Sequence, residues 1–294
     1  MRTRASKASM DKRVKKCEST DWLISIPLEL LHHILSFIDM KELIQMSVLS
    51  KNWRYMWKSL PTINISQEFW KGDEYEYPGS AFQYFVDKVL VGRDDSSDIY
   101  KFSLIVCEDF EEEEFPPIMF DGYINVVRIS NVQEIHLGAI PEIFVSTLIS
   151  LAEQVKVLKL VSISFHSDEE EFNVNSSTLE SLSLEECCVD LEGIIIHAPK
   201  LRYLVIDNND NDACKIEIHA PNLTLLHLRG YMYGEYSMGD LSLLVDAHID
   251  TLNVCKEKRG LVRRLNTLLK GLVHAQTLTI SAHAFQPVVE FEKA

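Results

Sequence analysis

Residues 197–206 read HAPKLRYLVI, and residues 219–228 read HAPNLTLLHL. The same His-Ala-Pro turn therefore opens the same apolar pattern 22 residues later. In both copies the order is apolar, two variable residues, apolar, one variable residue, apolar, and the last two apolar positions alternate as they do in a half-buried strand. Two copies at a fixed period indicate a repeat architecture, in which each copy is one structural unit.

The same pattern occurs eight times between residues 99 and 280. It is found at Ile99/Phe102/Leu104, Val132/Ile135/Leu137, Val155/Leu158/Leu160, Leu179/Leu182/Leu184, Leu201/Leu204/Ile206, Leu223/Leu226/Leu228, Ile249/Leu252/Val254 and Ala275/Leu278/Ile280. Successive starts lie 33, 23, 24, 22, 22, 26 and 26 residues apart, and all but the first spacing fall within about 20 to 29 residues, the range of leucine-rich repeats. We therefore expect a solenoid in which every repeat gives one strand to a shared parallel sheet and returns by a helix or a loop.

The repeats are expected to be irregular. Only Cys107, Cys187 and Asn209 stand where such repeats usually have Asn or Cys. Residues 261–272 have leucines at helical spacing and predict one helical return. Before the repeats, Ser80 is placed to cap a bridging helix, whose apolar face would carry Phe82, Phe85, Val86, Val89 and Leu90.

Residues 21–66 predict three short helices instead of strands. Pro27 suits the first position of a helix that carries Leu30, Leu31, Ile34, Leu35 and Ile38. Asp39 with Glu42 forms a capping pair for the second helix, and Ser50 would cap a third that carries Trp53, Trp57 and Leu60 on one face. The first helix is apolar on more than one side, so we expect either a partner protein on it or packing against the rest of the chain.

The run IPLELLHHILSFI at 26–38, followed by SVLSKNWR at 47–54 and by Trp57, resembles the F-box of plant-type F-box/leucine-rich-repeat proteins. FVDKVL at 85–90 resembles the helix that follows the F-box in that family, and LLKGL at 268–272 resembles the end of its repeat array, so the resemblance covers residues 21–285. The chain departs from the family at Trp22, Ile26 and Asn52. It ends at Ala294 without the C-terminal FBD segment of many relatives, which indicates a short or truncated member.

The resemblance implies that the F-box binds the Skp-type adaptor, and through it the cullin, of an SCF-type ubiquitin ligase. It places the adaptor contact at Ile26, Pro27, Leu30, Ile34, Leu35, Val48, Ser50 and Trp53. The repeats would bind the target protein on the concave side of the sheet, where strand residues alternate with the buried ones. The target-binding candidates are Glu134, His136, Lys159, Tyr203, Asp207, His227 and Arg229, with Ser183, Glu185, Asn253 and Thr279 in the same alternation. Tyr203 and Arg229 are the expected anchors, because Tyr and Arg are enriched among interface hot spots.

Charge and composition exclude several other classes of protein. The net charge is −15, divided into +6 on residues 1–16 and −21 on the rest, and an acidic body is a poor ligand for nucleic acid. The basic tail is either a nuclear-import signal or a solvated segment. No apolar run is long enough for a membrane span or a secretion signal. The six cysteines include no C-x-x-C pair, which favours the nucleus or the cytoplasm.

Enzyme and metal sites lack their usual sequence frames. The chain has no G-x-S-x-G, H-E-x-x-H, G-x-x-x-x-G-K-[ST] or G-x-G-x-x-G motif. Asp207, Asn209 and Asn211 imitate the start of a calcium loop, but Asp212 replaces the turn glycine and Ile218 replaces the bidentate Glu. The acidic runs at 108–114 and 168–171 are interpreted as solvated loops. We therefore predict no cofactor, no metal and no catalytic residue.

These observations predict an α+β or α/β chain, in which a small three-helix F-box precedes an irregular leucine-rich-repeat solenoid with a parallel sheet. The predicted boundaries are a disordered basic tail at 1–20, the F-box at 21–66, a linker and bridging helix at 67–95, the solenoid at 96–285 and a tail at 286–294. The predicted function is a non-catalytic substrate receptor of an SCF-type ubiquitin ligase. The alternative is a leucine-rich-repeat scaffold outside a ligase, or a competitor of full-length relatives.

Overall fold

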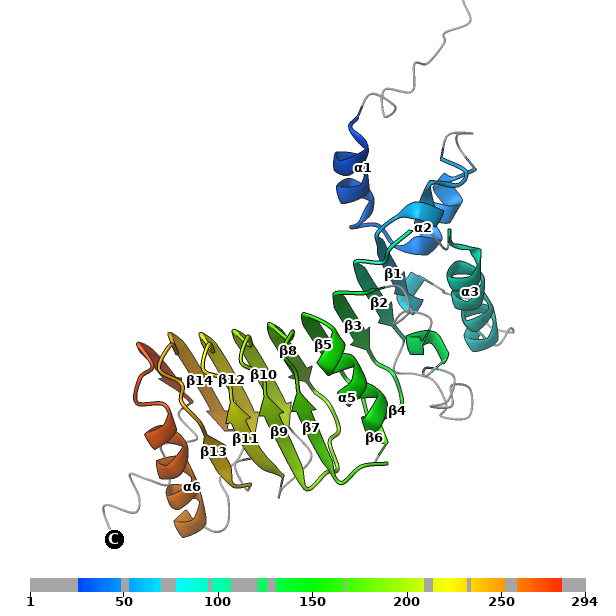
Figure 1. The fold of residues 1–294 in the computed structure, drawn as a ribbon. Coiled ribbons are helices and arrows are strands. Elements are labelled where there is room, and N and C mark those ends of the chain that lie inside the picture. The colour runs from blue at the N-terminus through cyan, green and yellow to red at the C-terminus, as the bar shows by residue number, and fades with distance from the viewer. Residues whose placement is uncertain are drawn as a thin grey trace, which may run out of the picture.

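The computed structural model describes residues 26–48, 53–69, 78–94, 97–106, 120, 122–125, 131–166, 168–208, 214–231, 234–251 and 258–281. Short helices at the N-terminal end stand beside an elongated stack of parallel strands (Figure 1). The fold is therefore a helical module followed by a solenoid with a parallel sheet, as the sequence predicts. Within the described residues, no helix is both long enough and apolar enough to cross a bilayer.

The helical module begins with α1 (Leu28–Leu35) and α2 (Met40–Met46). Pro27 lies one residue before α1 instead of at its first position, and its carbonyl accepts a hydrogen bond from the Leu31 N–H. The Asp39 carboxylate caps α2 by accepting from the Lys41 N–H at 2.7 Å. Its second oxygen accepts from the Ser66 N–H at 2.8 Å, so this cap also holds the first strand of the sheet.

The predicted third helix is reduced, in the described residues, to the 3₁₀ helix η2 (Met56–Ser59). Met56 and Lys58 donate to the carbonyls three residues earlier, Trp53 and Tyr55, which is the tighter 3₁₀ pattern. Pro61 explains the early end, because the residue before a proline avoids the helical region, and Leu60 is extended. The predicted cap, Ser50, lies outside the described residues.

One nine-stranded sheet runs along the whole solenoid, and all its pairs are parallel. Its strands, in spatial order, are β1 (Thr62–Ser66), β2 (Lys101–Ile105), β3 (Glu134–Gly138), β5 (Val157–Val161), β8 (Ser181–Glu185), β10 (Tyr203–Asn208), β12 (Leu225–Gly230), β14 (Asp246–Thr251) and β15 (Thr277–Ile280). From β1 to β14 the second and fourth residue of every strand are buried. β1 was assigned to the F-box from the sequence, yet it pairs with β2, so the helical module and the solenoid share one sheet.

The prediction for the repeat around β14 was wrong in register. The predicted triplet was Ile249/Leu252/Val254, but Ala247 and Ile249 pair with Leu226 and Leu228 and fill the interior. The preceding buried position is Leu244, so the triplet is Leu244/Ala247/Ile249, five residues earlier than expected. The sequence pattern expects a large apolar residue at each interior position and therefore does not detect Ala247. In the structure this small side chain occupies the interior position of its repeat.

A second layer carries the return segments. Its centre is a parallel sheet of β7 (Glu171–Asn175), β9 (Gly193–His197), β11 (Lys215–His219) and β13 (Tyr236–Met238), where alternating or continuous β-branched and aromatic residues favour strands. α5 (Val145–Gln154) packs on β7 and α6 (Lys258–Gly271) packs on β13, so helices close both ends of this sheet (Figure 1). The predicted helical return at 261–272 corresponds to α6.

Four further elements complete the fold near the N-terminal end. α3 (Pro78–Gly92) begins two residues before the predicted cap Ser80, and Phe82, Val86 and Val89 are buried on its predicted face. η3 (Gln67–Phe69) follows β1, and β4 (Ile143–Phe144) pairs with β6 (Phe165–His166). The Arg93 guanidinium, just after α3, donates to the Leu60 carbonyl at 2.7 Å and holds this helix against the helical module.

The strand ends share a turn that repeats with the solenoid. Ala139, Ser162 and Glu186 each follow the last residue of β3, β5 or β8, and all three have a positive φ between 50° and 54°. The Ala139 and Ser162 N–H groups donate to the last carbonyl of the next strand. Each left-handed residue costs roughly 1 kcal/mol or more, which is offset where the turn brings its N–H to an acceptor. Cys187, the next residue after Glu186, is buried, with Sγ 3.5 Å from the Glu185 carbonyl and 3.7 Å from the Leu160 carbonyl.

Candidate functional site

The first candidate surface lies on the helical module. Five large apolar side chains are exposed there, which we call the helical apolar face: Leu28 (61%), Leu30 (51%), Ile34 (45%), Phe37 (76%) and Val48 (84%). They are five of the fourteen exposed large apolar side chains of the described residues, yet they fall within 21 positions. Scattered exposed apolar residues are normal, whereas such a concentration marks an interaction surface.

The geometry of α1 explains why this face is left uncovered. Leu31 and Leu35, four residues apart, point into the core together with Leu43 of α2. Leu30 and Ile34 lie on a different side of the same helix, and Phe37 continues that side beyond the helix end. A helix that is apolar on two sides can bury only one of them within a module of this size. The other side is available to a second protein.

The structure divides the predicted adaptor residues into four groups. Pro27, Leu30, Ile34 and Val48 are exposed, and Ile26 and Trp53 are half-buried against the core. Leu35 is corrected: only 3% of it is exposed, so it supports α1 from inside and presents no surface. Ser50 lies outside the described residues. Leu28 and Phe37 belong to the exposed face but were not predicted, although the helical period from Ile34 already pointed to Phe37.

The second candidate surface is the outward face of the nine-stranded sheet. The strand register aligns the predicted target-binding residues in three rows across it. Glu134 and Tyr203 lie in the row of first residues, His136, Lys159 and His227 in the row of third residues, and Asp207 and Arg229 in the row of fifth residues. All seven therefore share one face, and Tyr203 is the most exposed large side chain among them, at 51%. Asn253 lies outside the described residues.

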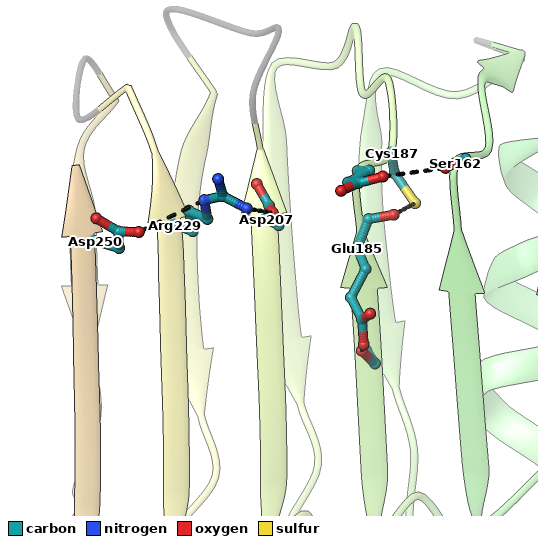
Figure 2. A network of polar contacts seen from close by, with 8 residues as sticks. Ser162, Glu185, Cys187, Asp207, Arg229 and Asp250 are labelled. Atoms are coloured by element: carbon teal, nitrogen blue, oxygen red, sulfur yellow. Dashed lines mark hydrogen bonds and ion pairs between the residues drawn. The ribbon is translucent and has the colours of Figure 1, made fainter. Parts of the chain in front are cut away.

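Most charged side chains on this face pair with a charged side chain on the neighbouring strand. Lys101 reaches Glu134 at 4.0 Å, and Lys159 reaches Glu185 at 3.0 Å. Arg229 lies between two acids, with Nη1 3.1 Å from Asp207 Oδ2 and Nε 3.6 Å from Asp250 Oδ2, so that it joins β10, β12 and β14 (Figure 2). Lys101 and Asp250 were not predicted. Lys101 precedes the buried Phe102 as Glu134 precedes Ile135, and Asp250 follows the buried Ile249 as Arg229 follows Leu228, so the alternation was the signal that could have found them.

Burial, neighbouring charges and hydrogen bonds together set the pKa values of the side chains on this face. Burial raises the pKa of the Asp207 carboxyl above its ordinary value, even though Arg229 acts in the opposite direction. Burial also lowers the pKa of His136, and the positive charges of Lys101 and Lys159 add to the effect, so His136 is neutral at physiological pH. For Glu185, the hydrogen bonds from Ser183 and Lys159 outweigh burial and hold the pKa below its ordinary value. The face therefore presents the neutral His136 imidazole near Lys101 and Lys159, together with charged side chains that pair with one another.

A hollow of about 500 Å³ opens on this face near its N-terminal end. It lies over Gly138 of β3, between the side chains of Ile105 and Val161, and Glu68 and Lys159 stand at its border. A Cβ at position 138 would lie 3.5 Å from two carbon atoms of Ile105, so the glycine leaves open the space that a side chain would take. This Gly138 hollow has an apolar floor and charged sides, as ligand pockets commonly do.

Comparisons with known proteins agree with the two-part fold. Residues 23–64 match the F-box domain family. Two F-box/LRR-repeat proteins of Arabidopsis thaliana are each 26% identical, one over 91% of this chain and 80% of the relative, the other over 90% of this chain and 63% of the relative. An Arabidopsis F-box/FBD/LRR-repeat protein is 24% identical over 96% of this chain and 70% of the relative. The chain thus resembles F-box/leucine-rich-repeat proteins over most of its length, and the helical apolar face lies inside the F-box match.

Proposed function

We propose that this chain is a substrate receptor of an SCF-type cullin-RING ubiquitin ligase. The F-box, residues 23–64, would bind the Skp-type adaptor and through it the cullin, and the outward face of the nine-stranded sheet would bind the target protein. The chain itself would carry out no covalent step. The observation that carries this proposal is the helical apolar face, because five exposed large apolar side chains inside the F-box match favour a protein partner.

The physical chemistry of the helical apolar face favours a protein partner. Burying five such side chains contributes on the order of 5 kcal/mol or more before the cost of association. His33, which is exposed on α1 and in edge contact with the Phe37 ring, adds a polar group beside this face, as is usual at the rim of a protein interface. An isolated receptor with this face exposed is expected to aggregate at high concentration, and the adaptor would remove that liability.

Two hydrogen bonds fix the helical module to the solenoid. The Asn64 side chain of β1 donates to the Ser36 carbonyl at the end of α1, and the Ser66 N–H donates to Asp39 at the start of α2. Since both donors belong to the first strand of the nine-stranded sheet, the sheet face has a defined position relative to the helical apolar face. A target held on the sheet would therefore be presented to the ligase at a high effective concentration, which is the contribution of a receptor without its own catalytic groups.

The test is complex formation between the full chain and a Skp-type adaptor, measured by size-exclusion chromatography with light scattering and by calorimetry. Ile34→Asp places a charge in the helical apolar face at a position that is already 45% exposed, so the fold should be retained. Val273→Asp is the matched control, because it changes another exposed β-branched residue, 70% exposed, just beyond α6 at the opposite end of the solenoid (Figure 1). The proposal predicts a one-to-one complex for the native chain and the control, and at least about tenfold weaker binding for Ile34→Asp.

The opposite result would favour the alternative. If the folded native chain does not bind the adaptor, or if Ile34→Asp and Val273→Asp bind equally well, the ligase assignment fails. The chain would then be a leucine-rich-repeat scaffold whose helical apolar face binds a different protein.

A further inference from the structure

The outward face of the second, four-stranded sheet carries a cluster of metal-ligating side chains. His197 at the end of β9 lies directly beside His219 at the end of β11, because the two residues are paired in the strand register. Glu217 is two residues before His219, so its side chain emerges on the same face. One ligand atom from each of the three residues lies within 4.8 Å of the other two.

The contacts within the cluster are close. His219 Nε2 is 2.9 Å from Glu217 Oε1, and the rings of His197 and His219 are stacked, with centroids 4.5 Å apart and planes 9° apart. The other Glu217 oxygen, Oε2, is 2.7 Å from the Lys215 ammonium. These contacts leave Oε1 and the imidazole nitrogens as the atoms that can reach a common point.

The backbone reserves space for the His219 ring. Gly239, whose N–H donates to the Ile218 carbonyl, lies next to that ring, and a Cβ at position 239 would come within 2.9 Å of His219 Nδ1. Any other residue there would force the ring to move. The ring therefore has a glycine on one side and the His197 ring on the other.

We propose that His197, Glu217 and His219 form a zinc site that joins two neighbouring repeats. Two histidines and one glutamate are an established ligand set for Zn²⁺, and they leave the fourth tetrahedral position open. Two adjacent ligand atoms of a tetrahedral zinc ion are about 3.3 Å apart, so the 2.9 Å pair of His219 and Glu217 needs to open by only a few tenths of an ångström. The larger movement falls to His197, whose side chain is exposed and can turn its ring plane toward the ion.

The charges around the cluster suit a cation. Glu217 supplies a carboxylate to the cluster, and its Oε1 lies 2.9 Å from His219 Nε2. Lys215 is the local competitor for this carboxylate, but it occupies Oε2 and leaves Oε1 for the metal. The net charge of −15 further favours the approach of a divalent cation.

The bound ion would link β9 to β11, and therefore successive repeats, on the side of the solenoid opposite to the face proposed for the target. With three protein ligands, the open position would hold water or a ligand atom from another molecule. From the sequence, the two His-Ala-Pro segments are interpreted as turns, so no metal is predicted there. The register of β9 and β11 brings the two histidines side by side, and residue spacing alone does not contain this pairing.

The test is isothermal titration of the untagged, metal-free full chain with zinc chloride, together with Cu²⁺ electron paramagnetic resonance to count nitrogen ligands. His219→Gln and Glu217→Gln remove one ligand each at partly exposed positions, and circular dichroism verifies that both variants are folded. The matched control is the double variant His227→Gln/His248→Gln. Those two histidines are also paired across neighbouring strands, with ring centroids 5.9 Å apart. They lie on the other sheet, and among the described residues no third ligand forms a cluster with them.

The proposal predicts one zinc ion per native chain, two nitrogen ligands on Cu²⁺, and at least about tenfold weaker binding for each ligand variant, because a site with two protein ligands is incomplete. The control variant should bind zinc as the native chain does. The proposal is overturned if the native chain binds no zinc, if the ligand variants bind as tightly as the native chain, or if the control variant loses the site. None of these readouts depends on the adaptor or on ubiquitin transfer.

Discussion

Arg229 should be a measurable source of stability, because it joins three strands of the nine-stranded sheet. Its guanidinium reaches Asp207 on β10 and Asp250 on β14 (Figure 2). Asp207 is the sensitive partner, since only 8% of its side chain is exposed. Replacing Arg229 by Met keeps the packing of the side-chain stem and leaves the Asp207 carboxylate buried without its counter-charge.

The expected loss follows from the exposure of the three side chains. Removing one partner of a fully buried ion pair costs about 3–5 kcal/mol. The Arg229 side chain is 39% exposed, so solvent screening reduces this value to about 1–2 kcal/mol. Asp250 is 42% exposed and 3.6 Å away, and such a surface contact adds at most about 0.5 kcal/mol. We therefore expect Arg229→Met to lower the free energy of unfolding by about 2 kcal/mol.

Urea unfolding, followed by circular dichroism, measures this loss. Asp207→Asn removes the unpaired charge, so the double variant should recover about 1 kcal/mol relative to Arg229→Met. Lys159→Met is the control, because its pair with Glu185 is exposed on both sides and should contribute less than about 0.5 kcal/mol. A loss for Arg229→Met no larger than that of Lys159→Met, or no recovery in the double variant, would refute the reasoning.

The difference between native chain and variant should also depend on pH. Burial raises the pKa of Asp207 in the folded state, so the folded state holds this proton more tightly than the unfolded state does. Ionisation of Asp207 therefore costs stability above its folded pKa, and this cost is larger when Arg229 is absent. The difference should be complete at neutral pH and should shrink as the pH falls through the folded pKa of Asp207, whereas a difference that persists in acid would point to lost packing.

Three further predictions concern other parts of the fold. Asp39→Ala removes the acceptor of two backbone N–H groups and should lower the free energy of unfolding by about 2 kcal/mol. Asp39→Asn keeps one acceptor oxygen and should lose about half as much, so equal losses in urea titrations would be the contrary result. Burial raises the pKa of Cys187 to about 12, so alkylation of the folded chain followed by peptide mass spectrometry should label the exposed Cys188 and not Cys187. Equal labelling of the two thiols would contradict the buried position of Cys187. Gly234→Ala should lower the melting temperature, because a Cβ there would lie 1.8 Å from the Cys214 carbonyl oxygen and the backbone must shift; an unchanged melting temperature would show that the loop adapts freely.

The sequence predicts the repeat interior well because burial leaves a regular pattern. Leu204 and Ile206 alternate with solvent-facing residues, and the period of 22 residues brings Leu226 and Leu228 into the same two rows. The same period predicts which side chains share the outward face. It fails at Ala247, where a small interior residue does not match a template of large ones.

Two features of the candidate surfaces depend on contacts that a sequence pattern does not contain. The side of α1 that is buried is decided by the packing of Leu31 and Leu35 against α2, and both Leu35 and Ile34 fit the helical period equally well. The return strands depend on which segments pair in the second layer, so the sequence indicated only a helix or a loop there. The cluster of His197 and His219 follows from that pairing, which explains why it was not predicted.

Hydrogen–deuterium exchange of the full chain, with and without a Skp-type adaptor, tests the central claim most directly. We predict that the adaptor protects backbone amides in α1, in α2 and around Val48, where the helical apolar face becomes buried. Amides of β8, β10 and β12 should keep their exchange rates, since the outward sheet face stays open for a target. Protection on those strands, with none in α1, would contradict the account, because the solenoid and not the F-box would then be the adaptor-binding surface.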